Sequence, residues 1–200
     1  MTADLSGEAA LVTGAASGIG RASAVAFASA GASVALLDID AEGLADTAAT
    51  VRAAGTRAEV LVADVRDLQA VTCAVGRAVQ AFGRLDAALN NAGMPGPYVP
   101  LDEYSEEDFM RILEVDLVGV WRCMRAEIRH MRAQGTGAIV NTSSMLGAAA
   151  MPDNQRKETF VKRSGMVWVD DVVMVLTCGS LLRVMPVCAG WRENAVRARV

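Results

Sequence analysis

The stretch Thr13-Gly14-Ala15-Ala16-Ser17-Gly18-Ile19-Gly20 places three glycines in one short turn. It directly follows an apolar segment predicted to be a strand, 9–13, and it opens a predicted helix, 18–30. Glycine allows a tight turn and close backbone approach, so the amides at the helix N-terminus can bind a pyrophosphate. A plain strand-to-helix loop is the alternative, but the flanking strand and helix favour a dinucleotide-binding turn.

An acidic residue lies at the distance from this turn that dinucleotide-binding domains use. Asp38 follows the second apolar segment, 33–37, and stands about 20 residues after the glycines. A carboxylate there can accept hydrogen bonds from both ribose hydroxyls and would repel a 2′-phosphate. The sequence therefore predicts NAD rather than NADP. A solvated loop carboxylate is the alternative for Asp38, and it is the preferred interpretation of the nearby Asp40.

Apolar segments alternate with helical segments on both sides of this turn, up to about residue 155. The predicted strands are 9–13, 33–37, 58–63, 86–89 and 137–142, and the predicted helices are 18–30, 41–54, 67–82 and 105–133. Ser105 is the expected N-cap of the last helix, with Asp108 completing a variant of the capping box. Left-handed glycines are expected just past the helices, at Gly31, Gly55, Gly83 and Gly135. This pattern predicts an α/β fold with a doubly wound parallel sheet of the Rossmann type, whose ligand crevice lies at the carboxyl ends of the strands.

Composition excludes several classes of protein. The chain has 200 residues, with 19 Lys and Arg against 23 Asp and Glu, so it lacks the basic field of a nucleic-acid-binding protein. The N-terminus does not resemble a secretory signal, and the charge-free run 22–37 is too short to span a bilayer. A cytoplasmic location is therefore expected. The four cysteines form no C-x-x-C pair, so they are expected to be buried free thiols and no metal site is predicted.

The chain changes character near residue 156. Residues 1–150 contain 33 alanines and residues 151–200 only three, and the only lysines, Lys157 and Lys162, lie just after the change. Residues 166–175 are dense in β-branched side chains around an Asp-Asp pair, which predicts a hairpin. We therefore expect a Rossmann-type NAD-binding domain over residues 1–155, followed by an atypical tail over residues 156–200.

Several motifs occur together in one order. The spacing T-G-x-x-x-G-x-G is followed by Ala63-Asp64-Val65, by Asn90-Asn91-Ala92-Gly93, and by the segment 137–144, which ends in Ser143-Ser144. In this combination the sequence resembles the short-chain dehydrogenase/reductase family, over residues 5 to about 155. The resemblance implies an NAD-dependent oxidoreductase that transfers hydride between a nicotinamide and an alcohol or ketone.

The resemblance also implies site residues. The cofactor-binding positions that match are Gly14, Ser17, Gly18, Ile19, Gly20, Asp38, Asp64, Val65, Asn91, Ala92 and Gly93. Ser144 matches the serine that hydrogen-bonds the substrate oxygen, and Asp116 stands where the family usually has asparagine. The partners implied are a small alcohol or carbonyl substrate and, through the helix 105–133 and the one after the serine strand, further copies of the chain. The altered tail should weaken that pairing.

The family's Tyr-x-x-x-Lys pair is missing. It should begin near position 157, but the only tyrosines, Tyr98 and Tyr104, precede the serine, and Lys162 has no tyrosine four residues before it. The stretch 183–190 weakly resembles the family's sixth strand. Three readings stay open: an oxidoreductase with impaired activity, a non-catalytic dinucleotide-binding or oligomer-partner protein, and a truncated product without a stable fold. A frame change, an alternative terminal exon or a degenerate paralogue would each explain the tail.

Overall fold

A mostly parallel sheet forms the centre of the protein. The structure, a computed structural model, describes residues 4–143, 167–169 and 172–178. The strand order is β3-β2-β1-β4-β5-β7-β6, and every neighbouring pair except β7 and β6 is parallel. The strands are β1 (Ala9–Thr13), β2 (Ser33–Asp38), β3 (Ala58–Val62), β4 (Ala87–Asn90), β5 (Gly137–Ser143), β6 (Val167–Val169) and β7 (Val172–Cys178). The order reverses between β1 and β4, which is where a doubly wound sheet opens a ligand crevice.

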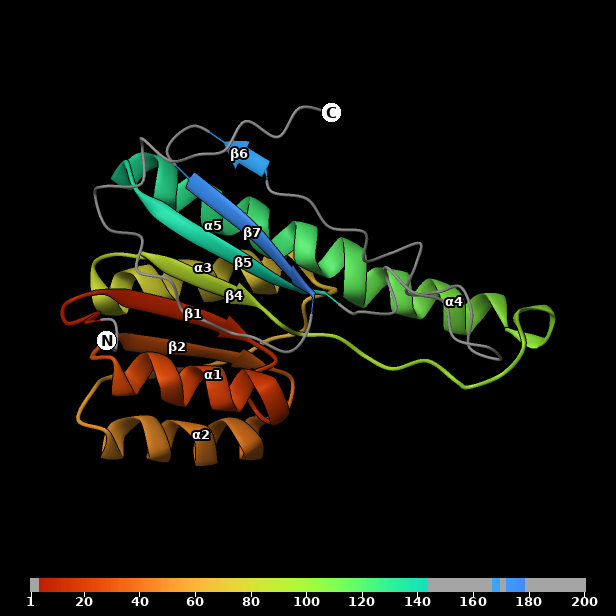
Figure 1. Cartoon of the computed structure of the whole chain (residues 1–200), viewed down its shortest axis with the longest axis horizontal. Coiled ribbons are helices and arrows are strands. Elements are labelled where there is room, and N and C mark those ends of the chain that lie inside the picture. Colours follow the sequence, from red (N-terminus) through yellow and green to blue (C-terminus); the bar gives the residue numbers. More distant parts are fainter. Residues whose placement is uncertain (1–3, 144–166, 170–171, 179–200) are drawn as a thin grey trace.

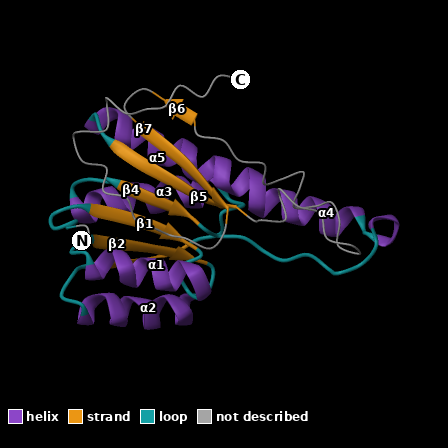
Figure 2. Ribbon diagram, in the orientation of Figure 1, coloured by secondary structure: helices purple, strands orange, loops and turns teal. Residues whose placement is uncertain are grey.

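Helices cover both faces of this sheet, as the doubly wound prediction requires. Helices α1 (Gly18–Ser29) and α2 (Ala41–Ala53) lie on one face, and α3 (Leu68–Phe82) and α5 (Val120–Gln134) lie on the other (Figure 1). The parallel strands all point toward one edge, from which the loops that follow them emerge (Figure 2). The predicted fold class is therefore confirmed, and the predicted bounds of these strands and helices agree with the structure to within one residue.

Side chains that point alternately to the two faces of the sheet divide the hydrophobic core into two layers. In β1, Val12 packs with the helices α1 and α2, whereas Leu11 packs with α3 and α5. In β2, Leu36 and Leu37 divide in the same way. Successive side chains on a strand point to opposite faces, so a strand with helices on both sides must be apolar throughout. All five residues of β1 are buried for this reason.

The predicted helix ends agree with the structure. The hydroxyl of Ser105 accepts a hydrogen bond from the backbone N–H of Asp108 at 3.0 Å, as an N-cap does. Gly31, Gly55, Gly83 and Gly135 all have positive φ angles, between 82° and 98°. The left-handed conformation ends each helix and turns the chain into the next strand.

The predicted helix over 105–133 is helical throughout, from Glu106 to Gln134, but it is not a regular α-helix. The structure divides this run into α4 (Glu106–Leu113), a π-helical segment η2 (Glu114–Gly119) and α5. A short 3-10 turn, η1 (Leu101–Glu103), precedes them. A π-helical turn accommodates an extra residue and is common at functional sites. Here Asp116 in η2 binds the backbone of the loop after β4, and Gly119 packs against Val65, so tertiary contacts shape the segment.

The predicted hairpin is present. Strands β6 and β7 pair antiparallel, with Val167 opposite Met174, and β7 extends the main sheet beside β5. The expectation of buried thiols is correct for Cys123 and wrong for Cys73, because Cys73 lies on the exposed side of α3. Cys188 lies outside the described residues, and Cys178 is the last residue of β7. Within the described ranges, no helix is both long and apolar enough to cross a membrane.

Candidate functional site

The glycine turn after β1 is packed too closely for side chains. Gly14 and Gly18 have φ angles of 66° and 51°, a region that favours glycine. A Cβ on Gly14 would lie 3.0 Å from the backbone nitrogen and Cα of Ala92, and a Cβ on Gly20 would overlap the carbonyl oxygen of Gly14. Ser17 is the N-cap of α1 without a side-chain cap bond, and it is exposed. The N-terminal amides of α1 therefore border an open surface at the turn, which suits an anionic group.

The hydroxyl of Thr13 joins this turn to the loop after β4. It accepts hydrogen bonds from the backbone N–H groups of Asn91 at 2.9 Å and Ala92 at 3.0 Å. The side chain of Asn91 lies against Gly14 and Gly20, and its Oδ1 accepts from the Thr142 hydroxyl at 3.2 Å. These contacts hold the ends of β1, β4 and β5 together at one edge of the sheet.

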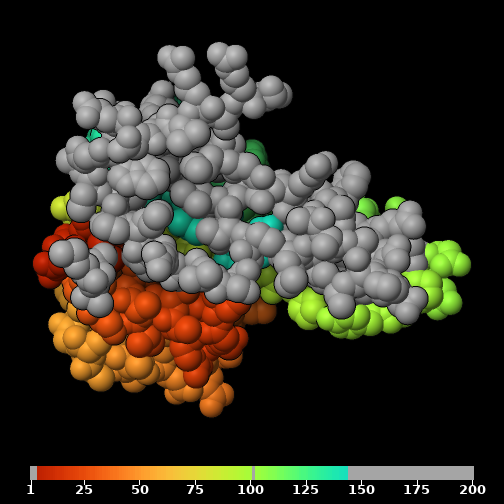
Figure 3. Space-filling model, in the orientation of Figure 1, coloured from red at the N-terminus to blue at the C-terminus, as the bar shows by residue number. Residues whose placement is uncertain are grey.

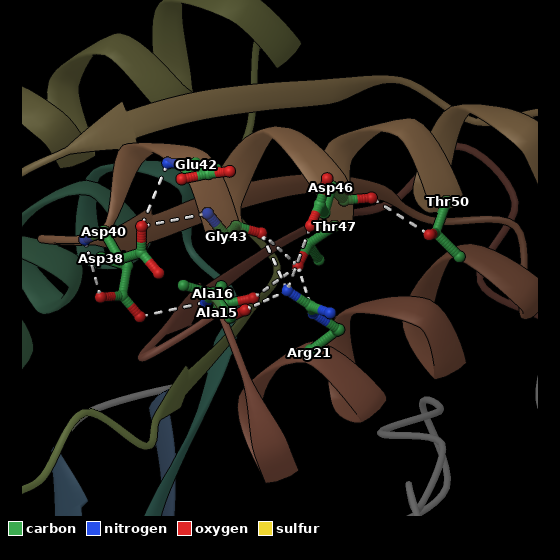
Figure 4. Close-up of polar contacts among 10 residues, drawn as sticks. All are labelled: Ala15, Ala16, Arg21, Asp38, Asp40, Glu42, Gly43, Asp46, Thr47 and Thr50. Carbon is green, nitrogen blue, oxygen red and sulfur yellow. Dashed lines mark hydrogen bonds and ion pairs between the residues drawn. The ribbon is translucent and has the colours of Figure 1, made fainter.

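Asp38 lies beside the glycine turn, as the sequence predicts. Its Oδ2 accepts from the backbone N–H of Ala16 at 3.0 Å, and its Oδ1 accepts from Ile39 at 2.7 Å and Asp40 at 3.1 Å (Figure 4). The carboxylate is therefore fixed in position, and only half-buried, so it can accept further bonds from a ligand. Asp40 has the structural role of capping α2, because its Oδ1 accepts from Glu42 and Gly43.

Arg21 supports the turn from the side of α1 and α2. Its guanidinium donates to the carbonyl oxygens of Ala16 at 2.5 Å and Gly43 at 3.3 Å, and to the Thr47 hydroxyl at 3.0 Å (Figure 4). The hydroxyl of Thr47 donates in turn to the carbonyl of Ala15 at 2.9 Å. Through these bonds Arg21 and Thr47 connect α1 and α2 to the backbone of the glycine turn.

The segment after β3 lies along the same edge. The Asp64 carboxylate accepts from Arg66 through Nε, Nη2 and the backbone N–H, with distances from 2.7 to 3.1 Å. This pairing with Arg66 lowers the pKa of Asp64 below its usual value, so the side chain is charged at neutral pH. Val65 is buried and would be 2.8 Å from a Cβ on Gly119. The loop after β3 is thus packed against η2.

Asp116 reaches the same loop from η2. Its Oδ1 accepts from the backbone N–H of Met94 at 2.9 Å and lies 3.3 Å from where a Cβ on Gly93 would stand. A carboxylate at this position adds negative charge beside the predicted site, while it still accepts a hydrogen bond from the loop backbone. Asp116 therefore helps to hold the loop that follows β4 in place.

The two tyrosines lie between β4 and α4, away from the glycine turn. Tyr98 is 78% exposed, and Tyr104 is half-buried near α4. Burial, and next the nearby charge of Asp108, raise the pKa of Tyr104 above its usual value. The stretch from about 100 to 110 forms one end of the molecule, opposite the surface of α1 and α2 (Figure 3). Neither phenol has a lysine partner of the expected spacing.

Most of the predicted cofactor positions gather at the carboxyl edge of the sheet. They are the glycine turn with Ser17 and the exposed Ile19, then Asp38, Asp64, Val65, Asn91, Ala92 and Gly93. Ser144 and Lys162 lie outside the described residues. Among the residues that the structure describes, no group of three or more metal-ligating side chains comes together.

Sequence reasoning missed three residues that organise this edge. Thr13 and Arg21 hold the glycine turn through bonds to the backbone, and Glu127 lies fully buried beneath Asn90. The signal for Glu127 was available, because it is a charged residue on the buried face of a helix, between Cys123 and Met131. The signals for Thr13 and Arg21 were only their places, at the first residue of the glycine motif and directly after its last.

The fold and this edge define a Rossmann-type dinucleotide-binding protein. A sequence model of the short chain dehydrogenase family matches residues 8–155. The chain is 39% identical over 189 residues to cis-4-hydroxycyclohexanecarboxylate dehydrogenase of Sinomonas cyclohexanicum, which covers 94% of this chain and 75% of that protein. It is 40% identical over 139 residues to levodione reductase of Leifsonia aquatica, covering 68% of this chain and 52% of that one. The chain therefore belongs to the short-chain dehydrogenase family, whose members here are oxidoreductases.

Solved structures agree with this assignment. A xylitol dehydrogenase bound to NAD+ superposes with a TM-score of 0.73 and 39% identity, over 75% of this chain and 58% of that one. A carveol dehydrogenase from Mycobacterium avium in complex with NAD superposes with a TM-score of 0.74 and 33% identity. That match covers 76% of this chain and 60% of the other. This chain thus spans about three fifths of the length of these structures. The alignment to the Sinomonas protein continues past residue 155, where the family-model match ends.

Replacing Gly20 with alanine should damage the site more than any comparable change on the surface. The added Cβ meets the backbone of Gly14, which cannot move without displacing Ala92, so we expect a loss of stability of about 1–3 kcal/mol or more. Cofactor binding should also weaken. Urea unfolding and titration with NADH would measure both effects.

Gly76→Ala is the matched control. Gly76 lies inside α3, and a Cβ there meets no atom within 4 Å, so the substitution should stabilise the protein by up to about 1 kcal/mol. A Gly20→Ala protein with unchanged unfolding and unchanged NADH affinity would contradict the packing argument.

Proposed function

We propose that this chain binds NAD(H) at the carboxyl edge of its sheet. The observation that carries the proposal is the hydrogen bond from the Ala16 amide to Asp38, which fixes an acceptor for ribose hydroxyls against the glycine turn. The N-terminal amides of α1 would bind the pyrophosphate, and Asp64 and Val65 would border the adenine. Asn91, Ala92 and Gly93 would line the side of the cleft that faces the nicotinamide.

NAD is favoured over NADP by the charges around the ribose position. Asp38 is accompanied by Asp40 and Glu42, both exposed, so a 2′-phosphate would meet several carboxylates. The guanidinium of Arg21 uses its Nε and Nη2 donors on carbonyls and a hydroxyl of the protein, and its Nη2 also lies 4.0 Å from Asp46. The acidic side chains around the ribose position therefore oppose a phosphate there.

The proposed reaction is hydride transfer between the nicotinamide and an alcohol or ketone, with Ser144 holding the substrate oxygen. We propose that turnover is severely impaired, because the sequence lacks the Tyr-x-x-x-Lys pair that should exchange the proton. Asp116 offers an acceptor where the family has an amide. The second candidate, a non-catalytic dinucleotide-binding or oligomer-partner protein, rests on the same missing pair and on the altered tail after residue 155.

The names of relatives suggest which substrates to test. The Sinomonas relative is a cis-4-hydroxycyclohexanecarboxylate dehydrogenase, and a Sphingobium indicum relative, 39% identical over 150 residues, is a 2,5-dichloro-2,5-cyclohexadiene-1,4-diol dehydrogenase. Both names describe a six-membered ring that carries a hydroxyl group. We therefore propose cyclic secondary alcohols and their ketones as the first substrate class.

Asp38 should set the cofactor preference. We expect NADH to bind more tightly than NADPH, since the carboxylate accepts from ribose and repels phosphate. Asp38→Ala should reduce the difference, whereas Glu42→Ala, which removes an exposed charge without a ribose contact, should change it less. Calorimetric titration of the three proteins with both cofactors measures this, and equal affinities in the unsubstituted chain would refute the role of Asp38.

Dehydrogenase activity should be absent or very low. A positioned acid/base contributes about 10²- to 10⁴-fold, and the lysine that would tune it is missing too, so we expect a loss at the upper end of that range or beyond. NADH oxidation with small ketones, and NAD reduction with cyclic alcohols, would be compared with those of the Ser144→Ala variant.

Robust turnover that depends on Ser144 would overturn the impaired-enzyme proposal. Tyr98, Tyr104 and Lys162 would then be the first candidates for the substitute proton donor, and single substitutions would separate them. Translation of the neighbouring reading frames past codon 155 would decide the origin of the tail, because a restored Tyr-x-x-x-Lys would identify a frame change.

Self-association should be weaker than the family resemblance implies. Met110, Leu117 and Trp121 are exposed along α4, η2 and α5, and we propose that this apolar stripe is the remaining pairing surface. The second pairing helix would fall in the altered region, so the buried area should be too small for a stable tetramer. Light scattering at micromolar concentration tests this, and a stable tetramer would contradict it.

A further inference from the structure

Glu127 is a carboxyl group in the hydrophobic core. It lies on the face of α5 that packs against the sheet, together with Cys123, Ala126 and Met131, and its exposed fraction is 0%. Its Oε2 accepts a hydrogen bond from Asn90 Nδ2 at 3.0 Å. Burying a charged carboxylate without a cationic partner costs free energy, because the charge loses its hydration.

Two buried asparagines complete the group around Glu127. Asn90 ends β4 and stands opposite Asn141 of β5 in the sheet register. Asn90 Nδ2 also donates to Asn141 Oδ1 at 2.9 Å, and Asn141 Nδ2 lies 3.3 Å from the sulfur of Met124. These hydrogen bonds connect α5 to both strands at their carboxyl ends. We call Glu127, Asn90 and Asn141 the buried triad.

The hydrogen bonds of the buried triad do not balance if Glu127 is charged. An asparagine amide has two N–H groups, and Asn90 uses them on Glu127 and Asn141. Asn90 Oδ1 and Glu127 Oε1 are both buried, and neither has a donor within the part of the chain that the structure describes. Both atoms are acceptors, so only a proton on the carboxyl group can turn one of them into a donor.

The surroundings favour that proton. Burial raises the pKa of Glu127 to about 7, against the smaller opposing effect of the Asn90 hydrogen bond. The facing groups on β4 and β5 are amides, which do not titrate, and on α5 the adjacent titratable group is Cys123. Burial, and secondly the charge of Glu127, raise the pKa of that thiol well above its usual value, while Arg122 lowers it. Cys123 therefore stays neutral while Glu127 titrates.

The buried triad lies directly under the proposed cofactor cleft. Asn90 precedes Asn91, whose backbone N–H donates to the Thr13 hydroxyl at 2.9 Å and whose side chain lies against Gly14 and Gly20. Asn141 precedes Thr142, whose hydroxyl donates to Asn91 Oδ1. A displacement of either asparagine would move the loop after β4 relative to the glycine turn.

We propose that Glu127, held as a neutral acid, is a positioning residue of the cofactor cleft, and that its ionisation loosens the ends of β4 and β5 and weakens dinucleotide binding. This inference rests on the proposed function, because it concerns regulation of the same site. Ionisation would place a charge in the core with Asn90 Nδ2 as its one donor among the described residues, and the triad would have to open to admit water. By linkage, NADH binding would raise the pH at which Glu127 ionises.

The test compares the protein with its Glu127→Gln variant, since glutamine reproduces the shape and the donor of a neutral acid. The dissociation constant for NADH should rise about tenfold between about pH 6 and about pH 9 in the unsubstituted protein, a coupling of ordinary size. In E127Q it should stay at the low value throughout. E107Q is the matched control, because Glu107 is exposed on α4, and it should show the unsubstituted profile. Identical pH profiles of the unsubstituted protein and E127Q would overturn the proposal.

Thermal unfolding gives an independent measurement. The folded protein keeps a proton on Glu127 that the unfolded chain loses near its ordinary pKa of 4.5, so stability falls as pH rises from about 4.5 to about 7. The melting temperature of E127Q relative to the unsubstituted protein should therefore rise over that window. A constant difference would show that Glu127 is not a neutral acid and would overturn the proposal regardless of binding.

If E127Q does not fold, infrared spectroscopy of the unsubstituted protein can take its place. A protonated carboxyl band at about pH 6 that disappears above about pH 8 supports the proposal, and its absence at pH 6 overturns it. If neither the unsubstituted protein nor its variants bind NADH at any pH, the proposed function is wrong and the positioning role is wrong with it. The melting and infrared results would then still decide the protonation state, so the two failures are distinguishable.

Discussion

The close packing of two turns, one after β1 and one after β4, is the constraint on which the rest of the site depends. Gly14 leaves no room for a side chain against Ala92, and the Thr13 hydroxyl binds the amides of Asn91 and Ala92. These contacts fix the distance between the two halves of the sheet where the strand order reverses. In doubly wound sheets the ligand crevice lies at this point.

Polar side chains are placed around this contact at different depths. Asp38 is half-buried at the rim, where three backbone amides hold its carboxylate and leave one side for a ligand. Glu127, Asn90 and Asn141 lie in the core beneath, where every unpaired group is costly. The rim can carry a charged carboxylate because water solvates it, whereas a charge on the buried group would be costly. The same strand ends therefore hold both the proposed recognition site and the buried triad proposed to modulate it.

The π-helical segment between α4 and α5 connects a third loop to this edge. Asp116 binds the Met94 amide, and Gly119 admits Val65 to close contact, so η2 touches the loops after both β3 and β4. A regular helix over the same residues would rotate Asp116 and Gly119 away from one of these partners. The irregular geometry is thus maintained by contacts with segments distant in the sequence.

The sequence by itself determined the doubly wound fold, the glycine turn, the acid at position 38 and the helix ends. Each of these depends on local chemistry: strand periodicity, glycine conformation, and capping by Ser105 and the left-handed glycines. It also identified the missing tyrosine and lysine, since that requires only the order of residues. Tertiary structure alone decided the π-helical geometry of η2, the exposure of Cys73, the arginine support of the turn and the triad at Glu127. These depend on which side chains meet across β4, β5 and α5, and residues such as Asn90 and Glu127, 37 positions apart, are brought into contact only by folding.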